Sequence, residues 1–261
     1  MVVNGSCEED WPQVAALARR FPDFIVPSFG YHPWSVHERT GDWQRALACH
    51  LDETPGAAIG EIGLDRWKPG LAYTDQEEVF IWQLRLAAQR NRPVSIHCLR
   101  AWGRLFDLLR QHPRPVRGFL LHSYGGPAEM VAPLAKLGAC FSFPGYFMHE
   151  RKERQRQTFQ RVPPDRLLME TDAPDQPLPR DEGRGAEDEA GVVRSSAALA
   201  PASAGGSPVR HTFTDPATGH EVNHPANLGV IYRFVAGMLG ENEEALAAQV
   251  EANFQRLFGN L

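Results

Sequence analysis

The chain has 261 residues, of which 43% are hydrophobic and 23% are charged, a composition typical of ordinary globular proteins. This composition excludes disorder, collagen and coiled coil as descriptions of the whole chain. The 27 basic and 32 acidic residues leave a formal charge of −5, which excludes a broad basic surface that wraps long nucleic acid. A compact site that holds one phosphate through a metal ion is compatible with this charge.

The cysteines and the hydropathy pattern indicate the compartment. The four cysteines lie far apart in the sequence and form no Cys-x-x-Cys pair, which argues against a disulfide scaffold and against a zinc ribbon. No stretch approaches the ~18 to 20 consecutive apolar residues of a membrane span, and no secretion-signal pattern opens the chain. We therefore expect a soluble cytoplasmic protein with no membrane contact.

Short apolar runs alternate with amphipathic segments along the chain, which predicts parallel strands joined by helices. The expected strands are residues 1–4, 24–29, 57–62, 93–97, 118–122, 138–143 and 166–170. The expected helices are residues 9–20, 43–51, 75–91, 102–111, 127–137, 150–161, 226–239 and 243–258. A closed (β/α)8 barrel needs eight strands and the pattern supplies seven, so a doubly wound open sheet fits the strand count equally well.

Residues 176–222 interrupt this alternation. They include a segment rich in acidic residues and Gly at 180–190 and a segment rich in Ala, Ser, Gly and Pro at 195–207. Such composition is typical of a loop or a disordered insertion. We therefore predict a single domain over 1–261 with an insertion at 176–222.

Four metal-competent side chains lie at the ends of four of the expected strands or just beyond them: Glu61, His97, His122 and Asp172. Because the carboxyl ends of parallel strands face one crevice, all four are expected to point into one site. Two imidazoles and two carboxylates form a ligand set suited to Zn²⁺, Mn²⁺ or a similar divalent ion. Each residue alone is better explained as a structural histidine or a helix cap, but four such positions on four strands favour a metal site.

Ordered motifs along nearly the whole chain resemble those of the TatD family of metal-dependent hydrolases. The motifs are Gly-Tyr-His-Pro at 30–33, Gly-Glu-Ile-Gly-Leu-Asp at 60–65, Ser-Ile-His-Cys at 95–98, His-Ser-Tyr-Gly-Gly at 122–126, Glu-Thr-Asp-Ala-Pro at 170–174, His-Pro-Ala-Asn at 224–227 and Asn-Phe-Gln-Arg-Leu-Phe at 253–258. The resemblance implies an α/β fold, a (β/α)8 TIM barrel of the amidohydrolase type. It also implies two divalent metal ions (Zn, Mn or Mg) and hydrolysis of phosphodiesters, typically as a DNA exonuclease.

The resemblance also implies roles for individual residues. Glu61 would lie between the two metals, and His97 and His122 would complete the second one. Asp172 would lie at the first metal and act as the base, so that Glu61 and Asp172 are the expected catalytic residues.

Further residues are expected around these ligands. His32 and Asp65 would line the pocket or support the ligands. Arg100 directly follows a strand and is expected to reach a substrate phosphate. Tyr124, within the motif that begins at His122, is grouped with these residues as a side chain that binds substrate or supports the ligands.

The chain departs from the family at its beginning. Family members open with a strand that ends in a His-x-His pair, which holds the first metal, whereas this chain has no histidine before His32. We expect a barrel without its first strand, a single remaining metal and reduced activity, with a misassigned start codon as the favoured cause. The open edges are expected to lower stability, and we expect a monomer or a weak dimer.

The functional prediction is a TatD-like deoxyribonuclease that acts on DNA or a small phosphoester. Two alternatives stay open. One is another amidohydrolase-type activity on a phosphoester or a cyclic amide. The other is a non-catalytic barrel that has lost its metal chemistry.

Overall fold

The computed structural model of the chain describes residues 1–179 and 210–259. The described residues fall into two compact units. The first comprises Met1–Phe143, Gln157–Leu168 and the segment from Ala248 onward, and the second comprises Pro144–Arg156 and the described part of Met169–Ala247. The predicted single domain therefore stays a prediction, and the low-complexity segments at 180–190 and 195–207 lie outside the described residues.

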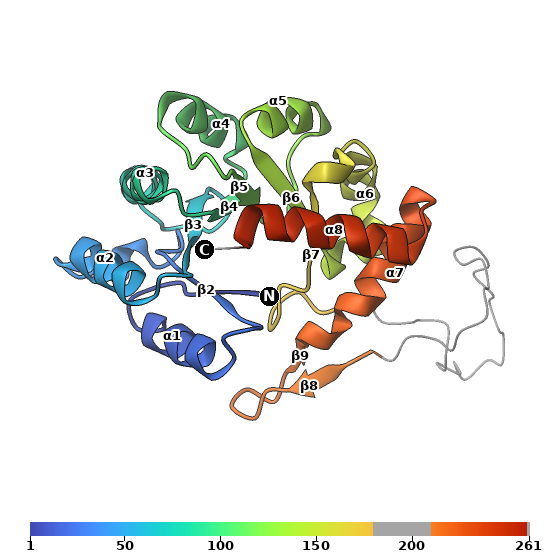
Figure 1. Cartoon of the computed structure of the whole chain (residues 1–261), viewed down its shortest axis with the longest axis horizontal. Helices are drawn as coiled ribbons and strands as arrows, with labels where there is room; N and C mark the ends of the chain where they lie inside the picture. Colours follow the sequence, from blue (N-terminus) through green and yellow to red (C-terminus); the bar gives the residue numbers. More distant parts are fainter. Residues whose placement is uncertain (180–209, 260–261) are drawn as a thin grey trace. The chain divides into compact units, whose positions relative to one another are not determined.

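A seven-stranded sheet contains all seven strands predicted from the sequence, in chain order (Figure 1). The strands are β1 (Val2–Asn4), β2 (Val26–Phe29), β3 (Ala58–Asp65), β4 (Val94–Leu99), β5 (Phe119–Leu121), β6 (Ala139–Pro144) and β7 (Leu167–Glu170). Each pair from β1 to β6 is parallel. Among the described residues β1 and β7 are the edge strands, which is the expected result for a (β/α)8 barrel that is one strand short of closure.

Helices follow the strands as expected. They are α1 (Trp11–Arg20), α2 (Trp43–Glu53), α3 (Tyr73–Arg90), α4 (Trp102–Gln111), α5 (Val131–Lys136), α6 (Glu153–Phe159), α7 (Leu228–Leu239) and α8 (Glu243–Phe258). The predicted helices 127–137 and 150–161 are shorter, because each begins with a 3-10 turn, Ala128–Met130 and Glu150–Lys152. No helix in residues 1–179 and 210–259 combines the length and the apolar character that a membrane span requires.

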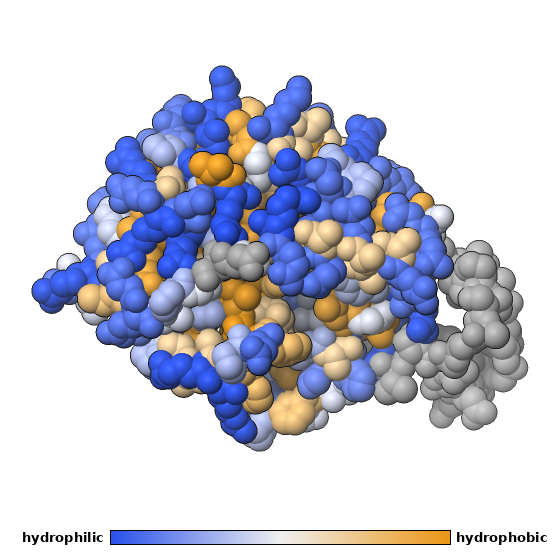
Figure 2. Space-filling model, viewed as in Figure 1, coloured by the Kyte–Doolittle hydropathy of each residue, from blue (hydrophilic) through white to orange (hydrophobic). Residues whose placement is uncertain are grey.

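Helices α1 to α5 lie on the outside of the curved sheet (Figure 1). Helix α4 illustrates why: Leu105, Leu108 and Leu109 recur at helical spacing and are buried, whereas Asp107 on the other side is exposed. Hydrophilic residues accordingly predominate over α2, α3 and α4 in the space-filling view (Figure 2). The inner strands are covered on both faces, and seven of the eight residues of β3 are buried, as are all those of β5 and β6.

An antiparallel hairpin lies within the region that was expected to be a loop. Strands β8 (Thr212–Thr214) and β9 (Glu221–Asn223) pair from Thr212↔Asn223 to Thr214↔Glu221. Asp215 closes the turn by accepting hydrogen bonds from the Ala217 N–H (3.0 Å) and the Thr218 hydroxyl (2.6 Å). The sequence did not predict these strands because all three residues of β8 are exposed and show no apolar alternation.

Gly63 permits the close approach of β3 and β4, and its replacement by alanine is expected to destabilise the first unit severely. It pairs with His97 in the register of the two strands, and an added Cβ would overlap the His97 carbonyl oxygen. Because that oxygen belongs to a central strand, it cannot move aside. We expect the free energy of unfolding in urea to fall by about 3 kcal/mol or more.

Gly103→Ala is the matched control for Gly63→Ala. Gly103 lies in α4 and has open space around the position of an added Cβ. Alanine there is expected to leave the stability unchanged or raise it by about 1 kcal/mol, because it favours helix. Equal stability of the Gly63→Ala and Gly103→Ala proteins would contradict the packing argument.

Candidate metal centre

Three of the predicted ligands come from consecutive strands of the first unit. Glu61 lies in β3 where the pairing register with β4 shifts, between Ile59 and Ile62. Such an irregularity re-aims a side chain relative to regular alternation. His97 lies in β4, and His122 follows β5 directly, where its N–H donates to the Ile96 carbonyl at 3.0 Å. The carboxyl ends of β3, β4 and β5 thus present these three groups together.

One oxygen of Glu61 is the centre of this cluster. Its Oε1 lies 3.5 Å from His97 Nδ1 and 3.5 Å from His122 Nε2. The side chains are 15% exposed for Glu61 and 12% exposed for each histidine. Although it is buried, Glu61 Oε1 has no hydrogen-bond partner among the described residues. A buried carboxylate oxygen without a donor is costly, so the site calls for a cation.

The spacing of these atoms fits a divalent metal ion. Two ligands at about 2.1 Å from a tetrahedral ion lie about 3.4 Å from each other. The two nitrogen–oxygen separations of 3.5 Å match that spacing and exceed an ordinary hydrogen bond. Burial raises the pKa of Glu61, but the nearby His122 and His97 outweigh it and hold the pKa well below its usual range. The carboxylate is therefore ionised and available as a ligand.

Asp65 orients His97 toward the centre. Its side chain is fully buried, and Oδ2 lies 3.0 Å from His97 Nε2. Burial raises the pKa of Asp65, but hydrogen bonds, the largest from His97, hold it well below its usual range. Burial lowers the pKa of His97, but the hydrogen bonds to Asp65 and Glu61 outweigh it and raise the pKa. Because Asp65 accepts a hydrogen bond from Nε2–H, Nδ1, which faces Glu61, is the nitrogen left to bind a metal ion, and the metal would displace any proton there. A carboxylate behind a metal-binding imidazole fixes its tautomer and its orientation.

The Asp65→Asn protein is expected to bind the metal about 10- to 100-fold more weakly. Asp65 accepts from four donors, and the amide of asparagine would turn its own N–H groups toward some of them. Titration of the metal-free protein with Mn²⁺ or Zn²⁺ measures the change. The exposed Asp107→Asn change in α4 is the control, and equal affinity of the two variants would contradict the orienting role.

His32 also lies in this cluster, in the segment after β2. His32, Glu61 and His97 each offer one ligand atom, and these three atoms lie within 4.8 Å of one another. The rings of His32 and His97 are 4.5 Å apart at their centroids. Burial lowers the pKa of His32 to about 4, so the ring is neutral. Its Nδ1 accepts from the Trp34 N–H at 3.2 Å, which assigns the ring proton to Nε2. In this tautomer His32 is a hydrogen-bond donor rather than a metal ligand.

Asp172 belongs to the second unit, in the loop after β7. It has a left-handed backbone conformation, with φ of 58°, and its Oδ2 accepts a hydrogen bond from the side-chain amide of Gln176. The amide of Asn223 donates to the carbonyl oxygens of Thr171 (2.7 Å) and Gln176 (3.1 Å), one on each side of Asp172. Asn223 is therefore a residue that the sequence analysis missed, because a buried asparagine carries no pattern of its own.

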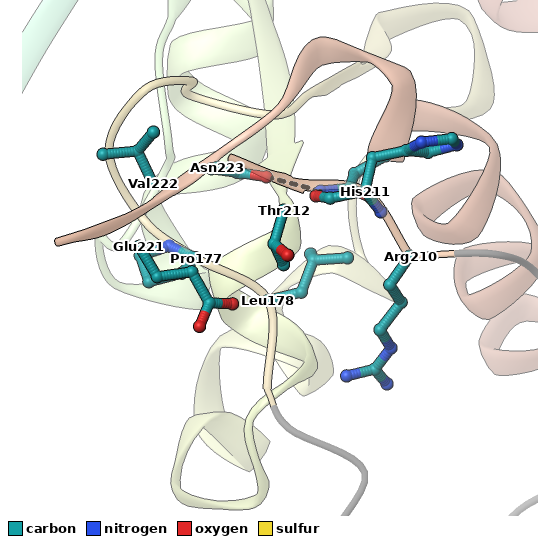
Figure 3. Close-up of a pocket in the computed structure, with 9 residues that line it drawn as sticks. Pro177, Leu178, Arg210, His211, Thr212, Glu221, Val222 and Asn223 are labelled. Atoms are coloured by element: carbon teal, nitrogen blue, oxygen red, sulfur yellow. Dashed lines mark hydrogen bonds between the residues drawn. The ribbon is translucent and has the colours of Figure 1, made fainter. Parts of the chain in front are cut away.

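Asn223 also lines a pocket of about 290 Å³ in the second unit (Figure 3). Its walls are formed by Pro177, Leu178, Arg210, His211, Thr212, Glu221, Val222, Asn223 and Asn227. Asn227, part of the motif at 224–227, exchanges hydrogen bonds of 2.8 Å with the backbone of His211 and donates to Asn223 Oδ1. The two asparagines thus attach the hairpin to the loop that carries Asp172.

Arg100 and Tyr124 differ in their surroundings. Arg100 follows β4, is exposed and has a φ of 56°. Tyr124 is fully buried, its hydroxyl donates to the Pro127 carbonyl at 2.8 Å, and its ring packs edge-on against Trp102 and Phe141. The structure therefore places Tyr124 in the core, with its polar atom already bonded, and only Arg100 has the exposure that substrate contact requires.

The fold and the cluster define a metal-dependent hydrolase built on an α/β barrel. The family model of TatD related DNase matches residues 1–259, and the chain belongs to this family. Two relatives are named "3'-5' ssDNA/RNA exonuclease TatD". The one from Pantoea ananatis is 29% identical over 260 residues, 99% of this chain and 87% of its own length. The one from Edwardsiella piscicida is 34% identical over 186 residues, 69% of this chain and 70% of its own length.

Solved structures agree with the fold. The TatD homologue YJJV of Escherichia coli superposes with a TM-score of 0.80 at 22% identity, and covers 100% of this chain and 86% of its own. A TatD family hydrolase of Entamoeba histolytica superposes with a TM-score of 0.75 at 16% identity, and covers 99% of this chain and 84% of its own. The predicted barrel class is thereby confirmed.

Proposed function

We propose that the chain is a metal-dependent exonuclease that hydrolyses phosphodiester bonds of single-stranded DNA or RNA. The observation that carries this proposal is the buried Glu61 Oε1, which has no hydrogen-bond donor within residues 1–179 and 210–259 and lies 3.5 Å from two imidazole nitrogens. Family membership and the printed names of the relatives support the substrate class.

Glu61, His97 and His122 would hold a divalent ion, Zn²⁺, Mn²⁺ or Mg²⁺. Such an ion lowers the pKa of water toward neutrality and stabilises negative charge on a phosphate oxygen. Asp65 keeps His97 in the tautomer that binds. The Nε2–H group of His32 can donate a hydrogen bond to a phosphate oxygen, and the Arg100 guanidinium can form an ion pair with a second phosphate.

Asp172 is the proposed base. It would accept the proton of the attacking water as the new oxygen–phosphorus bond forms and the bond to the leaving sugar oxygen breaks. Asn223 and Gln176 restrict the loop that carries Asp172, so its carboxylate is held in one conformation. We further propose that the protein acts in the cytoplasm, as a monomer or a weak dimer.

The test is hydrolysis of a single-stranded oligonucleotide labelled at its 5' end. We expect products that shorten progressively from the 3' end, loss of activity after chelation and recovery on addition of Mn²⁺, Mg²⁺ or Zn²⁺. Metal content is measured by mass spectrometry on protein purified without chelator. Activity that survives complete chelation, or no hydrolysis by metal-loaded protein, would overturn the proposal.

A further inference from the structure

Two tryptophans and two cations lie together at the carboxyl ends of β2 and β3 in the first unit. Trp34 follows β2, and Arg66, Trp67 and Lys68 directly follow β3. The rings of Trp34 and Trp67 are nearly parallel, with 28° between their planes and 6.5 Å between their centroids. Trp67 is 53% exposed, which is unusual for so large an apolar side chain.

Each cation lies over an aromatic ring, Lys68 over Trp34 of the pair and Arg66 over the neighbouring Tyr73. The Lys68 ammonium is 4.4 Å from the centre of the Trp34 ring, and the Arg66 guanidinium is 3.8 Å from the centre of the Tyr73 ring. The nearby acids are engaged elsewhere, since Glu77 pairs with Arg104 (2.6 Å) and Asp75 pairs with Arg39 (3.4 Å). The third acid nearby, Asp65, is buried, whereas Arg66 and Lys68 are exposed to solvent at this edge of the unit.

A single buried carboxylate ties this group to the metal centre. Asp65 Oδ2 accepts from the Trp34 indole N–H at 2.6 Å, and the same oxygen faces His97 Nε2. Asp65 Oδ1 accepts from the backbone N–H groups of Trp67 (2.6 Å) and Lys68 (3.0 Å). Asp65 thus fixes the Trp34 indole and the backbone at Trp67, and the Trp34 ring lies 6.3 Å from the His97 ring. A rigid site loses little entropy when a ligand binds.

We propose that Trp34 and Trp67, flanked by Lys68 and Arg66, form a base-stacking platform for a single nucleic acid strand beside the metal centre. Exposed aromatic rings stack on any base, and adjacent cations pair with the backbone phosphates. Bases of a duplex are already stacked and paired, so the platform selects unpaired strands regardless of sequence. This inference rests on the proposed function, because it names how the same site holds its substrate.

The test measures binding without hydrolysis, in chelator, by fluorescence anisotropy of a labelled oligothymidylate and of an abasic strand of the same length. The abasic strand keeps the phosphates and lacks the bases. We expect the unmodified protein to bind oligothymidylate more tightly than the abasic strand. Trp67→Ala should weaken oligothymidylate binding about 5- to 100-fold and leave abasic binding unchanged, whereas Trp67→Phe should retain most of the affinity.

Phe24→Ala is the matched control. Phe24 is 65% exposed and lies in the same unit, before β2, at the amino end of the strands. Its replacement should change neither affinity. A second readout needs no variant: oligothymidylate should quench the tryptophan fluorescence of the unmodified protein, and the abasic strand should not.

Equal affinity of the unmodified protein for the two strands, or equal effects of Trp67→Ala on both, would overturn the platform. Failure of the platform is distinguishable from failure of the proposed function. Base-dependent binding without metal-dependent hydrolysis would support the stacking platform and contradict the proposed exonuclease activity. Metal-dependent hydrolysis without base-dependent binding would support the exonuclease activity and contradict the stacking platform.

Discussion

Replacing Glu61 with glutamine is expected to remove the bound metal and to reduce hydrolysis on the order of 10³-fold. The two side chains have the same shape, but glutamine carries no charge and has one oxygen instead of two. The buried Oε1 is the atom that both His97 and His122 face, so no other group of the cluster can replace it.

The stability of the Glu61→Gln protein separates a site defect from a folding defect. Because the nearby histidines hold the pKa of Glu61 below its usual range, its ionised carboxylate stabilises the folded state, so the metal-free variant should unfold at a lower temperature than the metal-free parent but still in one cooperative transition. Glu78→Gln, at an exposed position of α3, is the control and should keep both metal and activity. Full metal content and full turnover of the Glu61→Gln protein would show that Glu61 is not a metal ligand.

Replacing Asp172 with asparagine is expected to reduce turnover by about 10²- to 10⁴-fold, the contribution of a positioned base. Metal content should stay at the level of the unmodified protein, because Glu61, His97 and His122 would hold the ion without it. The measurement is hydrolysis rate beside metal content on the same samples.

Asp175→Asn is the control for Asp172→Asn, since Asp175 is an exposed carboxylate of the same loop. If Asp172→Asn loses the metal as well, Asp172 is a ligand and not only a base. Unchanged turnover would exclude both roles.

The order of the strands and the identity of three clustered groups follow from the sequence. Strands buried on both faces appear as short apolar runs, so all seven were predicted, with ends that differ by at most three residues. A polar residue at the end of such a run has no packing reason to be there. That signal identified Glu61, His97 and His122, which the structure brings together.

Other features depend on contacts between residues far apart in the chain, which no local pattern records. The carboxylate of Asp65 connects Trp34, Trp67 and His97 only because β3 and β4 pair in this register. Asn223 reaches the loop of Asp172 across 52 positions of sequence. Tyr124 illustrates the converse, because its place in a polar motif left both substrate binding and ligand support open, whereas its ring fills the core.

The sequence by itself determined the strand order, the family and the ligand types, because these reside in periodicity and in residues at strand ends. Only the tertiary structure decided the spacing of 3.5 Å around Glu61, the tautomers of His32 and His97 and the hairpin in the expected loop. Those properties arise from hydrogen bonds and packing between distant segments, which exist only once the chain has folded.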